Sequence, residues 1–347
     1  MTHAAADAVQ ETARVNRATP PPTRARGRAH LVWLLLFTVH VVCAAAAASE
    51  QEETSASEGS VLTGAATSQG EPSAQKPPAF AADSLMYVYG PAYRNPYTTT
   101  PSEPDGADIA RHAVEFKHFD EWKFGHNLID VAIKKSSDVE PAAGGGTGVL
   151  ALYAVFRSGV GLNRTFGTHL ALGPLRDVAV EAGANLETKN SDYAPEERTL
   201  YFGPVLQFRF ASGFLNVGLH VRKEWNHNGN LGVNESYDTN FNIEPVWHFP
   251  FRIGAARLAF DGFGDLNTPK GKDASGHDTR TEIIVRPQLK LDVSRIIGQK
   301  QRVLEMGFGF QYFHNMFGKS ADVVPGAKEL TPIFTLTVHL PMGRKAG

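Results

Sequence analysis

The stretch FLNVGLHVRKEW, residues 214–225, alternates apolar and polar side chains along most of its length. One face carries Leu215, Val217, Leu219, Val221 and Trp225, interrupted by Lys223, and the other carries Asn216, Gly218, His220, Arg222 and Glu224. Successive side chains of a β-strand point to opposite faces, so this alternation predicts a strand with one apolar and one polar face. Segments 177–187, 282–293 and 304–315 repeat the pattern.

Working outward, the same alternation predicts twelve strands separated by loops rich in Gly, Asn, Asp and Pro: 85–93, 109–119, 122–133, 148–158, 174–188, 199–211, 213–225, 239–249, 252–265, 280–294, 302–316 and 329–340. About ten residues is the length that a tilted strand needs to cross a bilayer. Four prolines, Pro204, Pro245, Pro287 and Pro332, fall inside these segments. Because proline removes a donor from the ladder, we expect them near strand ends or at bulges.

The connections sort into two classes. Short links lie at Asp120-Glu121, Ser212, Pro250-Phe251 and around Gln299, and the long links are 94–108, 134–147, 189–198, 226–238, 266–279 and 317–328. The link 159–173 is long on the short side. Short turns on one side and long loops on the other are typical of outer-membrane barrels. The predicted fold is an all-β, closed antiparallel transmembrane β-barrel of twelve strands, with short periplasmic turns and long extracellular loops.

A soluble β-sandwich also has one apolar and one polar face, so alternation alone does not separate the two folds. Three features favour the membrane: a segment that predicts export, polar faces in which ionisable groups alternate with small residues, and aromatic side chains near the ends of apolar faces. The last group is Phe202, Phe210, Trp225, Trp247, Phe249 and Tyr312. Strands in lipid must also close, because an open edge leaves backbone groups unpaired.

The amino-terminal residues predict a leader and a linker. Arg24, Arg26 and Arg28 precede an apolar stretch, Leu31–Ala48, which ends in small residues, as a secretory signal peptide does. A membrane anchor is the alternative. Residues 1–48 are therefore predicted to be a signal peptide with a long basic region, 49–82 a disordered linker of polar and small residues, and 83–347 the barrel.

Composition excludes several classes of protein. The chain has 347 residues, 34 Lys and Arg against 36 Asp and Glu, and a formal net charge of −2, so nucleic-acid binding is not expected. A mean hydropathy of −0.23 argues against several membrane-spanning helices. The single cysteine, Cys43, cannot form an internal disulfide or a cysteine-based zinc site. Histidine spacing indicates no metal site, and no cofactor is implied.

The stretch from Ile109, IARHAVEFKHFDEWKFGHNLIDVAIKK, resembles the second and third strands of the Tsx-type nucleoside-specific outer-membrane channels, with Trp122, Phe124, Gly125 and Asp130 at matching positions. VAVEAGANLET, TLYFGPVLQFRF, FLNVGLHVRKEWNHNG, VWHFPF and LAFDGFGDLNTPKG resemble later strands in order and spacing. The resemblance implies a monomeric twelve-stranded barrel with a narrow pore for nucleosides. The aromatic amino-terminal region is matched only by residues 86–89, and the last strand ends on Leu340 instead of an aromatic residue.

If the polar faces point inward, they line a lumen. On these faces, the predicted pore-lining or solute-binding residues are Glu115, Glu181, Asn185, Asn216, His220, Arg222, Glu224, Arg286 and Glu305. Trp122, Phe124 and Asp130 share one face of the predicted strand 122–133. The resemblance implies that they contact the solute if that face is lumenal, and they are interface anchors if it faces lipid. Aromatic faces could stack on a flat solute, and amides and carboxylates could bind hydroxyl groups. Alternatively, these charges pair across strands and brace the wall.

An enzyme is not predicted. The outer-membrane phospholipase is also a twelve-stranded barrel, but the nearest string here, Asn226-His227-Asn228-Gly229-Asn230, contains no serine nucleophile. The sequence predicts a channel in the outer membrane of a Gram-negative bacterium, passing small polar solutes, with nucleosides implied by the resemblance. Expected partners are membrane lipid, the solute and, transiently, the barrel-assembly machinery. The alternative is a structural or surface-recognition barrel with a plugged lumen.

Overall fold

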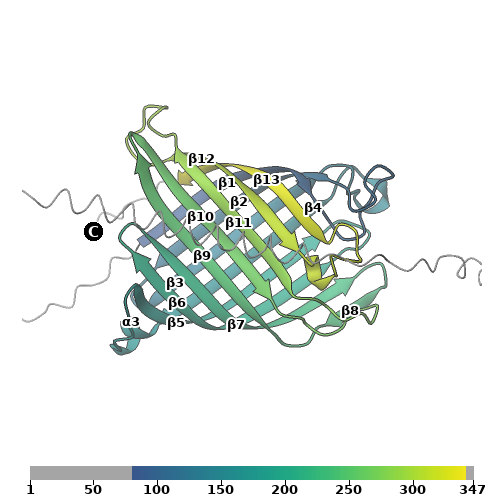
Figure 1. Cartoon of the computed structure of the whole chain (residues 1–347), viewed down its shortest axis with the longest axis horizontal. Helices are drawn as coiled ribbons and strands as arrows, with labels where there is room; N and C mark the ends of the chain where they lie inside the picture. The colour runs from purple at the N-terminus through teal and green to yellow at the C-terminus, as the bar shows by residue number, and fades with distance from the viewer. Residues whose placement is uncertain (1–79, 341–347) are drawn as a thin grey trace, which may run out of the picture. The chain divides into compact units, whose positions relative to one another are not determined.

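The structure, a computed structural model, describes residues 80–340 (Figure 1). Its strands are β1 (Phe80–Tyr93), β2 (Ile109–Glu121), β3 (Gly125–Ser136), β4 (Leu150–Gly161), β5 (Leu175–Lys189), β6 (Glu196–Phe210), β7 (Gly213–Asn228), β8 (Val233–Ser236), β9 (Asn240–Ile253), β10 (Ala256–Asn267), β11 (Glu282–Asp292), β12 (Leu304–His314) and β13 (Lys328–Leu340). The helical turns are η1 (Ala143–Gly145), α3 (Leu162–Phe166) and η2 (Met316–Gly318).

The strands form one closed antiparallel barrel. Each pairs with its neighbours in the chain, and β1 closes the ring by pairing with β13, where Tyr87 faces Leu336 and Tyr89 faces Phe334. The short β8 pairs with the last residues of β7, 225–228, and the two form a hairpin at the long-loop end of the barrel. The other strands make the barrel wall, so the predicted closed barrel of twelve strands is confirmed.

The connections follow the predicted two-sided pattern with some differences in length. Residues 122–124, 211–212 and 254–255 form tight turns at one end, and 162–174, which contains α3, is the long link predicted there. The short link predicted around Gln299 is wrong, because β11 ends at Asp292 and residues 293–303 form a longer link with its own backbone turns. The opposite end carries 94–108, 137–149, 229–239, 268–281, 315–327 and the shorter 190–195. The first residues of β1 and the last of β13 lie at the short-turn end, as an even number of strands requires.

The predicted signal peptide and most of the predicted linker precede the residues that the structure describes. The predicted signal peptide, 1–48, lies outside them, as does the linker up to residue 79. Strand β1 begins at Phe80, so the last residues of the predicted linker 49–82 belong to the first strand of the wall.

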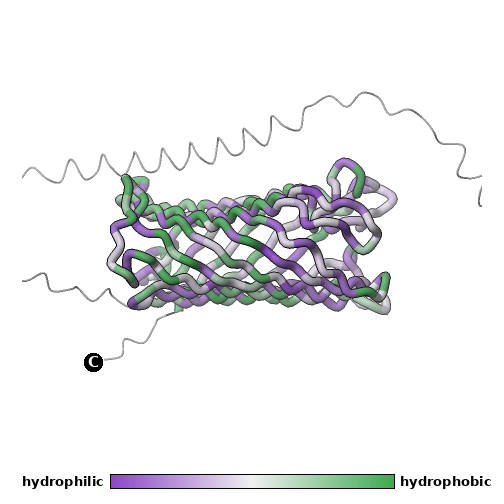
Figure 2. Tube along the Cα trace, turned by 90° about the horizontal axis from the view of Figure 1, so that it is seen from below, coloured by the Kyte–Doolittle hydropathy of each residue, from purple (hydrophilic) through white to green (hydrophobic). Residues whose placement is uncertain are grey.

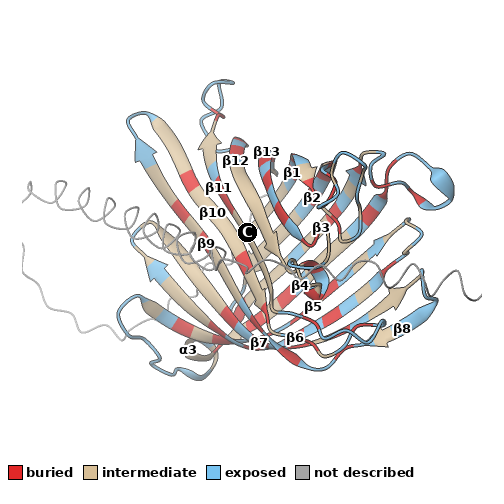
Figure 3. Cartoon of the chain, turned by 45° about the vertical axis from the view of Figure 1, so that its right-hand side comes forward, coloured by how far each residue is buried: buried red, intermediate tan, exposed pale blue. Residues whose placement is uncertain are grey.

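Hydrophobic and hydrophilic residues alternate along the strands (Figure 2), and buried residues alternate with more exposed ones (Figure 3). On β6, Leu200 and Phe202 are 54% and 61% exposed, whereas Thr199 and Tyr201 are 1% and 4% exposed. Apolar side chains exposed on the other strands, such as Ile133 and Phe308, continue the same outer surface. A continuous apolar exterior of this extent is suited to lipid and not to water. Among residues 80–340, no helix has the length and apolar character needed to span a membrane.

The aromatic side chains of the outer face differ in how far they are exposed. Trp225 is 37% exposed at the long-loop end, but Trp247 and Phe249, also on the outer face, are only 5% and 1% exposed. The Trp247 ring covers Gly262 on β10, where an added Cβ would lie 2.3 Å from the ring. Phe249 packs on Phe210, with ring centroids 5.5 Å apart. Neighbouring glycine and aromatic side chains therefore bury these two rings within the wall.

The expectation for the four prolines is also wrong. All four prolines, Pro204, Pro245, Pro287 and Pro332, lie inside strands. They occupy the alternate positions whose side chains point outward, towards lipid. The ladder is interrupted beside the first three, for example between Val285 and Gln288 on β11, yet the register continues unchanged beyond each gap. The lost donor is thus accommodated by a local break in pairing on one side of the strand, without a bulge.

The outward face of β6 provides a test of the barrel's orientation in lipid. We expect Phe202→Arg to lower the free energy of unfolding in lipid vesicles by about 2–4 kcal/mol, because it places a charge in hydrocarbon. Urea titration of the refolded barrel measures this loss. The matched variant Ser212→Arg, in a tight turn, should change stability by less than about 0.5 kcal/mol. Equal effects of the two substitutions would contradict the assignment of the exterior.

Candidate functional site

The interior of the barrel is the candidate functional site, and ten of the twelve predicted residues point into it. Inward parity and contacts with other inward side chains place them there: Glu115 on β2, Asp130 on β3, Glu181 and Asn185 on β5, Asn216, His220, Arg222 and Glu224 on β7, Arg286 on β11 and Glu305 on β12. Asn216 lies towards the short-turn end, between Gln207 and Val246 of the neighbouring strands.

Trp122 and Phe124 do not lie on a strand face, so their predicted place beside Asp130 is wrong. Both occupy the tight turn 122–124, which is closed by backbone hydrogen bonds in both directions between Trp122 and Gly125. Their rings pack edge to face with centroids 5.5 Å apart, and Trp122 is 37% exposed. The turn holds them at the rim of the barrel, because strand β3 begins only at Gly125.

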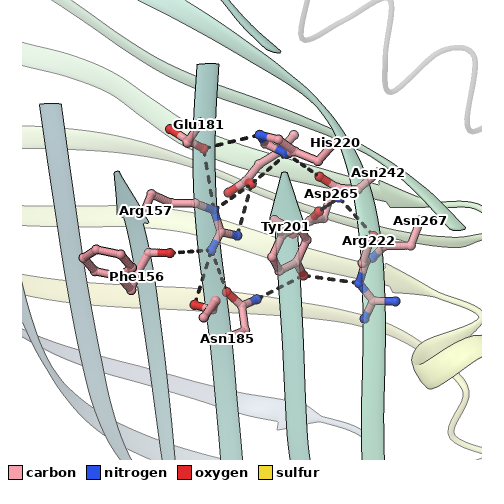
Figure 4. A network of polar contacts seen from close by, with 12 residues as sticks. Phe156, Arg157, Glu181, Asn185, Tyr201, His220, Arg222, Asn242, Asp265 and Asn267 are labelled. Atoms are coloured by element: carbon pink, nitrogen blue, oxygen red, sulfur yellow. Dashed lines mark hydrogen bonds and ion pairs between the residues drawn. The ribbon is translucent and has the colours of Figure 1, made fainter. Parts of the chain in front are cut away.

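Arg157 on β4 forms the first bridge across the lumen. Its guanidinium donates to Glu244 on β9, with Nη2 3.2 Å and Nε 3.3 Å from Oε2, although β5, β6 and β7 lie between the two strands along the wall. The same guanidinium donates to Asn185 at 2.8 Å and lies 4.2 Å above the Tyr201 ring. With only 4% of its side chain exposed, Arg157 fixes this side of the lumen (Figure 4).

Glu181 gathers two histidines beside this bridge. Its carboxylate lies 2.9 Å from His126 Nε2, 3.3 Å from His220 Nε2 and 3.9 Å from Arg157 Nε. His220 Nδ1 is 3.0 Å from the side-chain oxygen of Asn242. Figure 4 shows Glu181 between the side chains of Arg157 and His220. The carboxylates and the basic groups of this network stabilise each other in place of bulk water.

The network continues towards the long-loop end through Tyr201. Its hydroxyl accepts hydrogen bonds from Asn185 Nδ2 at 3.2 Å and from Arg222 Nε at 3.3 Å. Arg222 in turn donates to Glu224 at 2.5 Å, and Lys270 of loop 268–281 contacts the same carboxylate at 2.5 Å. A loop residue therefore reaches down into the barrel and joins the strand network.

A second bridge joins β11 to β2. Arg286 Nη1 lies 3.3 Å from Glu115 Oε1, although β12, β13 and β1 stand between these strands in the wall. The two side chains are 11% and 10% exposed. The Arg157–Glu244 and Glu115–Arg286 bridges thus cut across two sides of the lumen, and the space left between them is bordered by β3 and β10.

The space between the bridges is the part that solvent reaches. Lys117 and Asp130 face it from β2 and β3 and form an ion pair at 3.0 Å, with 43% and 21% of their side chains exposed. These fractions exceed those of both bridges. An inward lysine of this exposure indicates a wet passage beside the two paired constrictions.

Nearer the short-turn end, two further clusters line the interior. Asp261 lies 2.5 Å from His248 and 2.9 Å from Lys290. Glu305 lies 2.7 Å from Arg302 and 2.8 Å from His339. Each carboxylate is thus paired with two basic groups, as the bracing interpretation of the lumen charges predicts.

Glu140 of loop 137–149 closes one side of the mouth. Although it is in a loop, it is only 6% exposed, and it accepts hydrogen bonds from Asn95, Ser136, Arg111 and Lys189 at 2.5–3.1 Å. Burial by itself would raise the pKa of Glu140, but Lys189 and Arg111 outweigh this and hold it below its ordinary value. The loop is therefore docked by an ionised carboxylate.

The opposite side of the mouth is tied together by two other loops. Asp273 of loop 268–281 pairs with Lys319 of loop 315–327. Burial raises the pKa of Asp273, and hydrogen bonds from Lys319 and from nearby backbone groups lower it by more. Loops from both sides thus narrow the mouth through charged contacts.

Sequence reasoning missed Arg157, Glu140 and Lys270. On β4, the inward neighbours Ala151, Tyr153 and Val155 are as apolar as the outward ones, so alternation did not identify the inward face. Glu140 and Lys270 lie in loops, where no periodicity indicates which side chains turn inward. Among residues 80–340, no group of His, Cys, Asp and Glu side chains forms a metal site.

No protein-family model and no curated protein match this chain. Solved structures that are similar to it include the β domain of the Bordetella autotransporter BrkA, with 7% identity over 76% of this chain and 99% of that chain and a TM-score of 0.36. The translocator domain of NalP from Neisseria meningitidis has 8% identity over 76% and 88%, with a TM-score of 0.38. OccK5 from Pseudomonas aeruginosa has 8% identity over 75% and 98%, with a TM-score of 0.26.

With TM-scores below 0.5, these similarities assign neither family nor function. The barrel rests on its closed strand pairing, and the sequence resemblance to nucleoside channels stays a prediction.

The Arg157–Glu244 bridge can be tested by its effect on stability. We expect Arg157→Ala to lower the free energy of unfolding by about 3–5 kcal/mol, because it leaves buried carboxylates without their partner. The exposed pair of Arg198 and Glu196 on the outer wall is the matched control, and Arg198→Ala should cost about 0–1 kcal/mol. Denaturant titration in vesicles measures both, and a loss below about 1 kcal/mol for Arg157→Ala would contradict the bridge.

Docking of loop 137–149 should depend on pH. Because the pKa of Glu140 is lower in the docked loop than its ordinary value of 4.5, its contribution is complete above pH 4.5 and declines as the pH falls through the lowered pKa. A spin label at Val139 should become more mobile below about pH 4. Glu140→Gln should release the loop at neutral pH, whereas Asp138→Asn, an exposed neighbour, should not. A label that is equally ordered in all three proteins would exclude Glu140 as the anchor.

Proposed function

We propose that this chain is an outer-membrane β-barrel through which small polar solutes diffuse passively. The observation that carries the proposal is the combination of an apolar exterior with an interior wall of charges of both signs, in which Lys117 and Asp130 remain solvent-exposed between the two bridges. The 43% exposure of this inward lysine supports water-accessible space between the bridges. Balanced charges favour a neutral or zwitterionic solute over an ion of one sign.

The proposed location is the outer membrane of a Gram-negative bacterium, reached by export with the predicted signal peptide. Closed barrels are one of the two structures that can span a bilayer, and the closed pairing leaves no wall edge for another copy to complete. The resemblance to nucleoside channels supports a monomer, and the division into long loops and short turns supports long loops outside the cell and short turns in the periplasm.

Nucleosides are the proposed solute class within this function. The support is the resemblance of residues 109–135 and of the later strands to nucleoside channels. A base could stack on an inward ring while the sugar hydroxyls bind carboxylates and amides.

A plugged structural barrel is the second candidate, and the two bridges favour it. Both span the lumen with side chains that are at most 16% exposed, and loops 137–149 and 268–281 are anchored over the mouth. If the bridges and loops close every path, the barrel acts only through its long loops.

Single-channel conductance of the purified chain in planar bilayers separates the two candidates. We expect a small, steady conductance that falls when adenosine or thymidine is added. Arg157→Ala should raise the conductance by about twofold or more, because it removes the Arg157–Glu244 bridge, and Arg198→Ala on the outer wall should leave it unchanged.

Conductance that does not respond to nucleosides would retain the channel and exclude the proposed solute. A heat-modifiable, folded barrel without conductance would contradict the channel and support the plugged barrel, and restored conductance in Arg157→Ala would then identify the plug.

A further inference from the structure

The outer wall carries a groove that the proposed channel does not use. It has a volume of about 570 Å³ and lies at the long-loop end of β5, β6 and β7, where β8 extends the wall. Its lining includes Leu186, Leu200, Arg198, Trp225, Asn234 and Ser236. The wall of a barrel is convex, so a hollow on its outer face is a feature that requires explanation.

Strand register explains how the groove is built. Leu186, Arg198, Trp225 and Ser236 are successive cross-strand neighbours on β5, β6, β7 and β8 and form one row on the outer face. The next row towards the membrane centre contains Ala184, Leu200 and Lys223. The apolar floor of the groove is made by Ala184, Leu186, Leu200 and Trp225, and the polar side chains of its rim include Arg198, Asn234, Glu235 and Ser236.

The floor is continuous with the lipid-facing surface. Leu186 and Leu200 are 52% and 54% exposed, as are many outward side chains of the apolar belt. Trp225 is 37% exposed beside them, and Lys223 Nζ lies 5.7 Å from the centre of its ring. A tryptophan with a nearby cation is typical of the boundary between hydrocarbon and headgroups. An acyl chain is therefore the occupant that the floor fits.

The rim supplies the chemistry for a headgroup. The side chain of Arg198 is 62% exposed, and its ion-pair partner Glu196 is 58% exposed, so the pair is weak and the guanidinium is open to a competing anion. Asn234 and Ser236 add hydrogen-bonding groups, and Lys223, below Trp225 on the same face, donates to the backbone carbonyl of Tyr237. Arginine binds phosphate through paired N–H groups.

We propose that this groove, defined by the rows Leu186–Ser236 and Ala184–Lys223, is a binding site for a phosphorylated lipid of the outer leaflet. One acyl chain lies along Leu186 and Leu200, and a phosphate contacts Arg198. The site rests on the proposed outer-membrane location but not on the channel activity, because Leu186, Leu200 and Arg198, which contact the lipid, face away from the lumen.

Native mass spectrometry of the purified full chain tests the site, with diphosphoryl lipid A as probe and phosphatidylethanolamine as the comparison lipid. We expect one tightly bound lipid A, about tenfold weaker binding of phosphatidylethanolamine, and about tenfold weaker lipid A binding in Arg198→Ala. Ala184→Trp fills the floor while keeping the charges and should abolish binding. Arg176→Ala, exposed at the other end of β5, is the matched control and should bind as the unmodified chain does.

Heat-modifiable migration shows that each variant is folded. Phosphatidylethanolamine also carries a phosphate, but its ammonium group balances the charge, so equal binding of the two lipids would overturn selection of an anionic phosphorylated lipid by Arg198. Unchanged lipid A binding in both Arg198→Ala and Ala184→Trp would overturn the site. Conductance, measured in parallel, should be the same in Arg198→Ala and the unmodified chain, so loss of the lipid site and loss of the channel are separate results.

Discussion

Pairing of the backbone across the β1–β13 seam is the constraint on which the rest of the structure depends. Hydrocarbon offers no hydrogen-bond partner, so an open sheet edge would leave N–H and C=O groups unpaired at a cost of several kcal/mol each. The seam runs from Asp83 opposite Leu340 to Tyr89 opposite Phe334. Once it closes, each residue of the wall has only two directions available, towards lipid or towards the lumen.

The lumen contacts follow from this division. Charged side chains excluded from the exterior are concentrated inside, where each carboxylate needs a cation or a donor. Arg157 and Arg286 satisfy that need by reaching to Glu244 and Glu115 across several strands. The same contacts narrow the passage, so the features that brace the barrel also determine what can pass. The same ion pairs therefore serve both a channel and a plugged barrel. The two differ in whether the space beside Lys117 continues through the barrel.

The alternation of apolar and polar residues predicted the barrel well, because each side chain of a closed wall faces either lipid or the lumen. It placed ten of twelve candidate residues in the lumen. Alternation failed at three residues. Trp122 and Phe124 lie in a turn, where side chains do not alternate, and the inward neighbours that precede Arg157 are apolar. Glu140 and Lys270 could not be identified from the sequence, because their contacts join loops to distant strands. The expectation that the prolines lie at strand ends or bulges failed, because a strand can lose pairing on one side without changing the alternation of its residues.

The inward and outward assignment of β7 is the central claim, and spin labels placed singly at Leu215, Asn216, Val217, Gly218 and Leu219 test it most directly. In lipid vesicles, relaxation by oxygen should be high at 215, 217 and 219, and relaxation by a water-soluble nickel complex relative to oxygen should be higher at 216 and 218. Such a period of two supports the barrel as described. No periodicity, or oxygen exposure at 216 and 218 instead, would contradict the register and every lumen contact derived from it.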